Sequence, residues 1–278
     1  MYPASVTALI RQAINSIKNQ SQFVRYLIII FGILFSQYAN AGLSLSQAII
    51  HFEDDGKRSE DVEVFNQGQE TLYVRVEPSV IINAGTENEK REVYRDPKAA
   101  GLLVTPQRLV VAPGARKRLR FVRLDNPKSA SIDKVFRVLV KPEVGEVKAN
   151  QTAVKVIVAY EVLVLSQPDN AKPQLKSSFD FTKKTLTVSN LGNTNVLLQK
   201  GFQCPEGQST EDADNQCVEL VGKRIYSTNT WQVEVPFTTP VTYQISTGLD
   251  NSLVTFEPDK NTQIKTNQLD NTNSKNNN

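Results

Sequence analysis

The side chains that most often carry out catalysis are scarce in this sequence. It has a single histidine, His51, and two cysteines, Cys204 and Cys217. His51 stands between Ile50 and Phe52 in an apolar run, which is typical of an ordinary strand residue. The sequence contains no G-x-S-x-G motif, no H-E-x-x-H motif and no phosphate-binding loop. We therefore expect a protein that is not an enzyme, with no cofactor, no metal site and no small-molecule substrate.

A row of valines is the pattern best suited to binding a partner. Val154, Val156 and Val158 occupy every second position at the start of residues 154–165, VKVIVAYEVLVL. The run is too rich in β-branched residues to favour a helix, so it predicts a long strand with the valines on one face. Its second half is apolar on both faces except at Glu161. Two interpretations are open: the valines face the core of their own domain, or they face outward and are offered to another polypeptide.

The charge balance argues against a nucleic acid partner. The formal net charge is +3, but Arg11, Lys18 and Arg25 precede residue 42 without any acidic residue beside them. The remainder of the chain carries 29 basic and 29 acidic residues. Binding to nucleic acid depends on an excess of cations that neutralise phosphates, and this part of the chain has none.

Residues 1–41 read as a signal peptide. The three cations precede an apolar run at residues 26–35, YLIIIFGILF, and Ala39-Asn40-Ala41 fits a small-x-small cleavage site. The apolar run is shorter than the roughly 20 residues that a spanning helix needs, although an uncleaved anchor remains the alternative. We expect cleavage after Ala41 and export of the chain. In an exported chain, two cysteines predict a disulfide, Cys204–Cys217.

Residues 42–166 predict an immunoglobulin-like sandwich. Short strand-like runs alternate with turn signals, and no stretch shows helical periodicity. The runs are residues 43–52, 61–65, 71–77, 102–111, 116–123, 135–140 and 154–165. Residues 83–98 are polar and predict a loop.

A second β domain is expected at residues 167–258. A linker with two prolines, residues 166–175, separates it from the first domain. Its core is small, and closing the Cys204–Cys217 loop would stabilise it by roughly 3 kcal/mol. Residues 259–278 are polar and rich in asparagine, which predicts a disordered tail. The fold class is therefore all-β, with two immunoglobulin-like sandwiches joined by a short linker.

Residues 116–123 form an unusually basic strand. Arg116, Arg118 and Arg120 fall on one face, because side chains alternate along a strand. Two interpretations are open: an exposed sheet face whose long stems cover apolar surface, or a docking face for an acidic partner.

The order of these features resembles the periplasmic chaperones of the chaperone–usher pilus pathway, the PapD-like family. The resemblance extends over about residues 43–258 and is closest to the alternate, α-type members. It rests on Pro106-Gln107-Arg108-Leu109, Pro113-Gly114, Arg118-Leu119-Arg120-Phe121 and Val135-Phe136-Arg137-Val138. It implies that the partners are pilus subunits and an outer-membrane usher. It also implies that Val154, Val156 and Val158 form the strand donated to a pilus subunit.

The chain also departs from this family. Many members grip the carboxylate of the bound pilus protein with an arginine in the first strand and a lysine in the closing strand, where this chain has Ile49 and Leu163. Arg137 and Lys155 are the substitute candidates. The family's interdomain salt-bridge arginine would fall at Gln167. The alternative function is a secreted pilin-like or adhesin structural protein.

Overall fold

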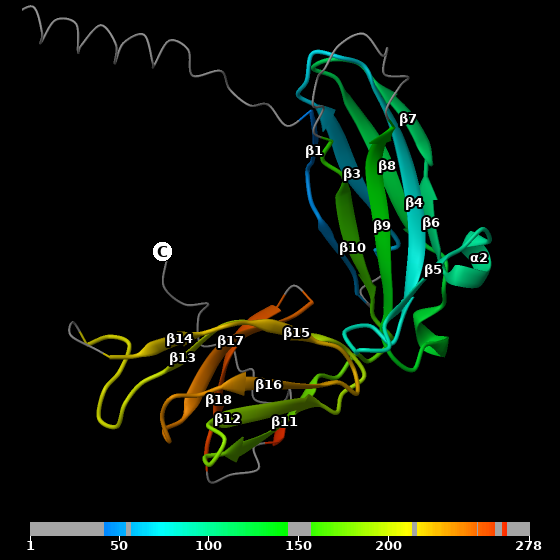
Figure 1. Cartoon of the computed structure of the whole chain (residues 1–278). Coiled ribbons are helices and arrows are strands. Elements are labelled where there is room, and N and C mark those ends of the chain that lie inside the picture. The colour runs from blue at the N-terminus through cyan, green and yellow to red at the C-terminus, as the bar shows by residue number, and fades with distance from the viewer. Residues whose placement is uncertain are drawn as a thin grey trace, which may run out of the picture. The chain divides into compact units, whose positions relative to one another are not determined.

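The structure, a computed structural model, describes residues 42–53, 57–143, 157–212, 216–248, 250–258 and 263–265, the last three in backbone only. The described part of the chain is almost entirely β-strand (Figure 1). None of its helices is long and apolar enough to cross a membrane.

The first sandwich consists of two sheets. One has the strand order β1 (Leu43–Leu45), β3 (Ser59–Asn66), β8 (Arg116–Arg123) and β6 (Leu102–Thr105). The other has the order β2 (Ile49–Phe52), β10 (Tyr160–Ser166), β9 (Lys134–Glu143), β4 (Leu72–Ile82) and β5 (Lys90–Val93), with β7 (Arg108–Val111) also on β4. A one-turn helix, α2 (Pro97–Ala100), and a 3₁₀ turn, η1 (Pro127–Ser129), lie in the connections.

The core of this sandwich follows from alternation along the strands. On β9, Phe136, Val138 and Val140 are fully buried, while the residues between them point to the outer face. Leu119 and Phe121 of β8 meet them from the opposing sheet. Every second side chain of these strands is apolar. This alternation predicted the strands from the sequence, and it also places their apolar side chains in the core between the two sheets.

The second sandwich has its own two sheets and its own core. One sheet has the order β16 (Thr230–Glu234), β12 (Thr185–Asn190), β11 (Gln174–Asp180) and β19 (Gln263–Lys265). The other has the order β14 (Val218–Leu220), β13 (Val196–Gln203), β17 (Val241–Thr247) and β18 (Asp250–Phe256), with β15 (Lys223–Ile225) also on β13. Tyr243 and Phe256 are the largest side chains of its core, and Cys204 and Cys217 form the predicted disulfide.

Each sandwich contains a buried asparagine with the same set of hydrogen bonds. Asn66 accepts from the Gly68 N–H and donates to the carbonyls of Glu70 and Val111. Asn190 likewise accepts from the Gly192 N–H and donates to the carbonyls of Thr194 and Ile225. Both asparagines are fully buried. The sequence N-x-G at the end of a strand thus closes the same turn in both sandwiches.

The prediction of an all-β fold with two immunoglobulin-like sandwiches is confirmed. One detail is wrong: the stretch expected to be a loop, residues 83–98, contains β5 and the start of α2, because β5 pairs with the long strand β4. In the expected tail, residues 259–278, the structure describes only residues 263–265, which form β19 and pair with β11. The disordered tail stays a prediction. The predicted signal peptide, residues 1–41, lies outside the described residues.

Candidate functional site

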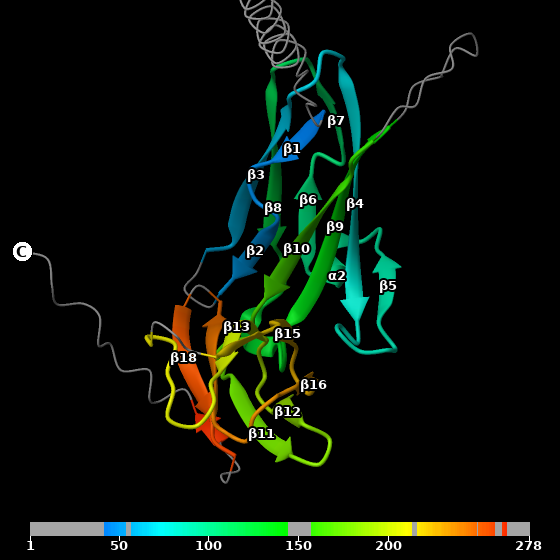
Figure 2. The ribbon, with the colours of Figure 1, turned by 60° about the vertical axis from the view of Figure 1, so that its left-hand side comes forward.

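Strand β10 is paired along its whole length on one side and along half of it on the other. It runs antiparallel to β9 from Tyr160, opposite Val140, to Ser166, opposite Lys134. On its other side it runs parallel to β2, and that pairing begins only at Leu163. Figure 2 shows β10 between these two neighbours. Within the described residues, the amino-terminal half of β10 therefore presents an open backbone edge, which is a template for a further strand.

Val164, Val162, Tyr160 and Val158 are alternate residues that form one apolar row along β10 and the segment before it. This row leaves the core at its amino-terminal end. Val164 and Val162 are fully buried, and Tyr160 is partly buried against the same core. Val158 comes two residues earlier and is 41% exposed, and its neighbour Ile157 is 38% exposed. Alternate residues that fill the core at one end of the segment thus reach solvent at the other.

The segment before β10 differs from the prediction. A single strand was expected over residues 154–165, but residues 157–159 are not in a strand. The physical reason is pairing: the ladder to β9 ends at Tyr160 and that to β2 ends at Leu163, so the backbone before them has no described partner. Val154, Lys155 and Val156 lie outside the described residues, and their roles remain predictions.

Ile49 and Leu163, which stand where the resemblance would place a carboxylate-binding pair, lie side by side. Leu163 is opposite Ile49 on β2 and opposite Arg137 on β9. Ile49 is 45% exposed, so an apolar pair occupies a place on the outer face of the sheet. Neither residue has a group that binds a carboxylate. Arg137 is thus the nearest cation on that row.

Arg137 already has a partner. Its Nη1 donates to Oε2 of Glu161 at 2.9 Å, and the other oxygen of Glu161 pairs with Arg91 of β5. The Arg137 side chain is 32% exposed, and its Nε is buried without a hydrogen bond to any described residue. One carboxylate therefore lies between two guanidinium groups on the outer face of the sheet.

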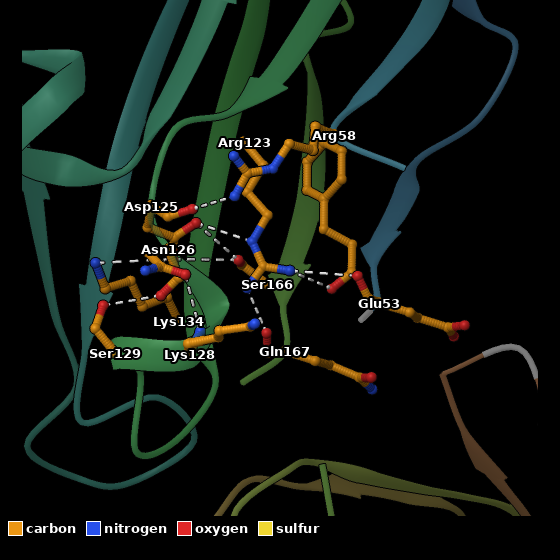
Figure 3. A network of polar contacts seen from close by, with 11 residues as sticks. Glu53, Arg58, Arg123, Asp125, Asn126, Lys128, Ser129, Lys134, Ser166 and Gln167 are labelled. Atoms are coloured by element: carbon orange, nitrogen blue, oxygen red, sulfur yellow. Dashed lines mark hydrogen bonds and ion pairs between the residues drawn. The ribbon is translucent and has the colours of Figure 1, made fainter. Parts of the chain in front are cut away.

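The most buried ion pair of the first sandwich was missed from the sequence. Arg123 of β8 is 2% exposed, and its Nε donates to Oδ1 of Asp125 at 2.9 Å. Its Nη groups donate to the carbonyls of Phe52, Glu53 and Gln167. Figure 3 shows Glu53 and Gln167 beside the guanidinium. A signal was available in the sequence: Arg123 shares the inward row of β8 with Leu119 and Phe121, which favours burial of its side chain.

The arginines of the basic strand are paired within their own sheet. Arg116 bonds to Glu63 at 2.9 Å, and Arg118 and Arg120 both pair with Asp61. The hydrogen bond from Arg120 lowers the pKa of the Asp61 carboxyl below its ordinary value. These contacts favour the interpretation of residues 116–123 as an exposed sheet face, because the neighbouring strand β3 already supplies the acidic partners.

The single histidine, His51, is held in its neutral form by its surroundings. His51 is partly buried on the outer face of β2, opposite Leu165, and its Nδ1 is buried without a hydrogen bond to any described residue. Burial, and secondly the positive charge of Arg224, lowers the pKa of the imidazole from its ordinary 6.5 to about 4. The ring is therefore neutral at pH 7. No cluster of His, Cys, Asp and Glu that could hold a metal occurs in the part of the chain that the structure describes.

Comparison with known proteins finds fimbrial proteins. No family model matches the chain. A CFA/I fimbrial subunit of Escherichia coli is 30% identical over 173 residues, which cover 60% of this chain and 70% of that protein. A CS1 fimbrial subunit of Escherichia coli is 26% identical over 179 residues, which cover 63% of this chain and 73% of that protein.

Solved structures with the same fold carry chaperone names. The class 5 fimbriae chaperone CfaA has a TM-score of 0.56 and 23% identity, with 78% of this chain and 99% of that chain covered. A chain from a chaperone–tip adhesin complex of CFA/I fimbriae biogenesis has a TM-score of 0.52 and 23% identity, with 78% and 100% covered.

Proposed function

This chain belongs to the PapD-like family of pilus-assembly chaperones, and we propose that it binds pilus subunits in the periplasm by donating a strand to them. Its partners are fimbrial subunits, which it stabilises and delivers to an outer-membrane usher. The donated strand is the segment that runs from Val154 through Val158 into β10. The function requires binding and release only, so the proposal includes no catalytic step.

A single observation supports this proposal above the others. Among the described residues, the amino-terminal half of β10 has an open edge, and the apolar row that continues from it reaches solvent at Val158. An extended polypeptide that lacks one strand of its own sheet could pair with such an edge and place the exposed side chains in its groove. Val154 and Val156 would then extend the row into the same groove.

The energetics fit a temporary complex. A pilus subunit with a missing strand exposes apolar surface and unpaired backbone groups, both unfavourable in water. Burying each valine would contribute about 1.5–3 kcal/mol at most. Three valines and the backbone pairs are strong enough to hold such a partner. They remain replaceable by a strand that fits the groove better, so no nucleotide hydrolysis is needed.

Arg137 is the proposed anchor for a carboxylate of the bound pilus protein. It lies on the row of Ile49 and Leu163, and its guanidinium binds the Glu161 carboxylate in the free chain. A carboxylate of the partner would take over this guanidinium, since arginine binds carboxylates with charge-assisted hydrogen bonds. Lys155 is the second candidate, from its place beside the valines.

A pilin-like or adhesin structural protein is the second candidate function. The names of the two relatives, both fimbrial subunits, favour it. A structural protein would assemble into fibres or attach to the cell surface. A chaperone would instead remain a soluble periplasmic protein that leaves its cargo at the usher.

The test is co-expression of the full chain with the products of its neighbouring genes, followed by purification from the periplasm. The proposal predicts that a small β-rich pilus protein elutes with the chain in a complex of one copy of each. Recovery of the chain in surface fibres, with no such complex, would favour the structural protein instead.

A further inference from the structure

The buried guanidinium of Arg123 joins three separate segments of the first sandwich. It donates to the carbonyls of Phe52 and Glu53, at 3.4 and 3.3 Å, at the end of β2. It also donates to the carbonyl of Gln167, the first residue after β10. Since Arg123 itself is on β8, one side chain ties β8 to the ends of β2 and β10 (Figure 3).

Asp125 compensates this buried charge, because an isolated buried cation would be strongly unfavourable. It is 8% exposed and accepts the Nε–H of Arg123 at 2.9 Å. The Ser166 hydroxyl lies 3.4 Å from its Oδ2, and the Lys134 ammonium lies 3.8 Å from the same oxygen. Asp125 therefore holds Arg123 in place and adds a second contact to the last residue of β10.

Strand β10 is consequently held most firmly at its carboxyl end. The ladder to β2 occupies residues 163–166 and is extended by the bond from the Gln167 N–H to the Phe52 carbonyl, at 2.9 Å. The contacts of Arg123 and Asp125 are at this same end. At the amino-terminal end, Tyr160 pairs with β9 alone among the described strands.

We propose that Arg123 is a positioning residue that fixes the carboxyl end of β10 and the start of the linker, so that the amino-terminal end can pair with another polypeptide without the strand leaving its sheet. A strand that is donated at one end must be held at the other, since otherwise strand exchange would pull it out of its own sandwich. The fixed carboxyl end of β10 does not depend on any partner and can be tested on the free chain. Its use in the capture of pilus subunits rests on the proposed function.

Hydrogen exchange of the full chain, measured by mass spectrometry, tests the fixed end without any partner. We compare the wild type with Arg123→Gln, Arg123→Lys and Asp125→Asn. The matched control is Arg120→Lys, which changes an exposed arginine of the same strand that pairs with Asp61. We expect exchange of the amides of residues 163–167 to become about tenfold faster in Arg123→Gln, since local opening removes protection there.

Arg123→Lys keeps the charge but loses the fork of donors, so we expect a smaller acceleration at the same amides. The control and the second sandwich should exchange as in the wild type. Should Arg123→Gln fail to fold, Arg123→Lys and Asp125→Asn decide the matter by the same local pattern. Unchanged exchange at residues 163–167, or equal acceleration throughout the sandwich, would overturn the proposal.

Capture of the co-expressed pilus protein is then measured with the same variants. The proposal predicts that the folded variants with faster exchange at residues 163–167 recover at least about fivefold less of this partner than the control. Normal capture by such a variant would overturn the positioning role even though the contacts exist. Absence of capture by the wild type itself would instead contradict the proposed function, and the exchange data would still decide whether Arg123 fixes the strand.

Discussion

The Arg137 guanidinium donates to the Glu161 carboxylate across the neighbouring strands β9 and β10, at 2.9 Å. Glu161 is the single charged residue in the apolar half of the donor segment, and it also pairs with Arg91. In the free chain this carboxylate occupies the cation that we propose as the anchor for a pilus subunit. Glu161, the charged residue of β10, and a carboxylate of the bound pilus protein would therefore compete for the same guanidinium.

Replacing the two members of this pair should have opposite effects on capture. Arg137→Ala removes the proposed anchor, and we expect about tenfold weaker binding of the pilus protein, or about 1.4 kcal/mol. Glu161→Gln frees the guanidinium and should leave binding unchanged or make it tighter. Titration of the purified partner against each variant gives the dissociation constants. Equal weakening in both variants would mean that Arg137 acts through Glu161 and does not bind the partner.

The exposed valine should matter for binding and not for folding. Val158→Asp, and likewise Val156→Asp, should abolish co-elution of the pilus protein while the melting temperature stays within about 2 °C of the wild type. The matched controls are Val221→Asp, at a 70% exposed valine of the second sandwich, and Val162→Asp, at a fully buried one. The first should change nothing, and the second should unfold the sandwich, because it buries an unpaired charge. Unfolding of Val158→Asp would mean that this valine is a core residue.

The two buried asparagines should contribute strongly and equally to stability. Asn190→Ala removes three hydrogen bonds and leaves the buried carbonyls of Thr194 and Ile225 without this donor, so we expect a loss of about 2–4 kcal/mol. Asn66→Ala should behave alike. Urea unfolding measures both, with the exposed Asn251→Ala as the control, expected within about 0.5 kcal/mol of the wild type. Losses no larger than that of the control would show that these turns do not need their asparagines.

Stability should fall in mild acid because of His51. The pKa of His51 in the folded chain, about 4, lies below its ordinary value of 6.5. Between pH 6.5 and pH 4, His51 is therefore protonated in the unfolded chain and neutral in the folded chain. Lowering the pH from 7 to about 4.5 should therefore reduce the free energy of unfolding. The part due to His51 should be about 1–2 kcal/mol, since partial exposure weakens the effect.

The measurement for His51 compares urea unfolding of the wild type and His51→Gln at both pH values. The difference between the two proteins isolates this residue from the carboxylates, which also titrate in this range. The same pH dependence in both proteins would show that the imidazole is not held neutral by its surroundings.

Much of the fold could be predicted from the sequence, because the alternation of apolar and polar residues determines which segments form strands and which of their faces is buried. The inward row of β4, with Val74 and Val76 buried, follows from the pattern LYVRVE, and the turn at Asn66-Gln67-Gly68 follows from its residue types. The short strands β5 and β19 could not be predicted in this way. Their residues are polar and exposed or near a chain end, and only pairing with β4 and β11 makes them strands.

The candidate site could be derived from the sequence only as a hypothesis. The valines were singled out by their spacing, and they stay a prediction. Ile49 and Leu163 are opposite each other in the register of β2 and β10. The role of Arg123 could not be derived from periodicity, although its inward position could. Its partners Phe52, Glu53 and Gln167 act through backbone carbonyls, which leave no trace in residue type.

The central claim is that the segment from residue 154 to residue 162 forms backbone hydrogen bonds with a pilus subunit. Hydrogen exchange of these amides, compared between the free chain and the purified complex with its co-expressed partner, tests it most directly. The account predicts strong protection of alternate amides in this segment on complex formation, with little change in the second sandwich. A stable complex in which residues 154–162 exchange as fast as in the free chain would contradict it.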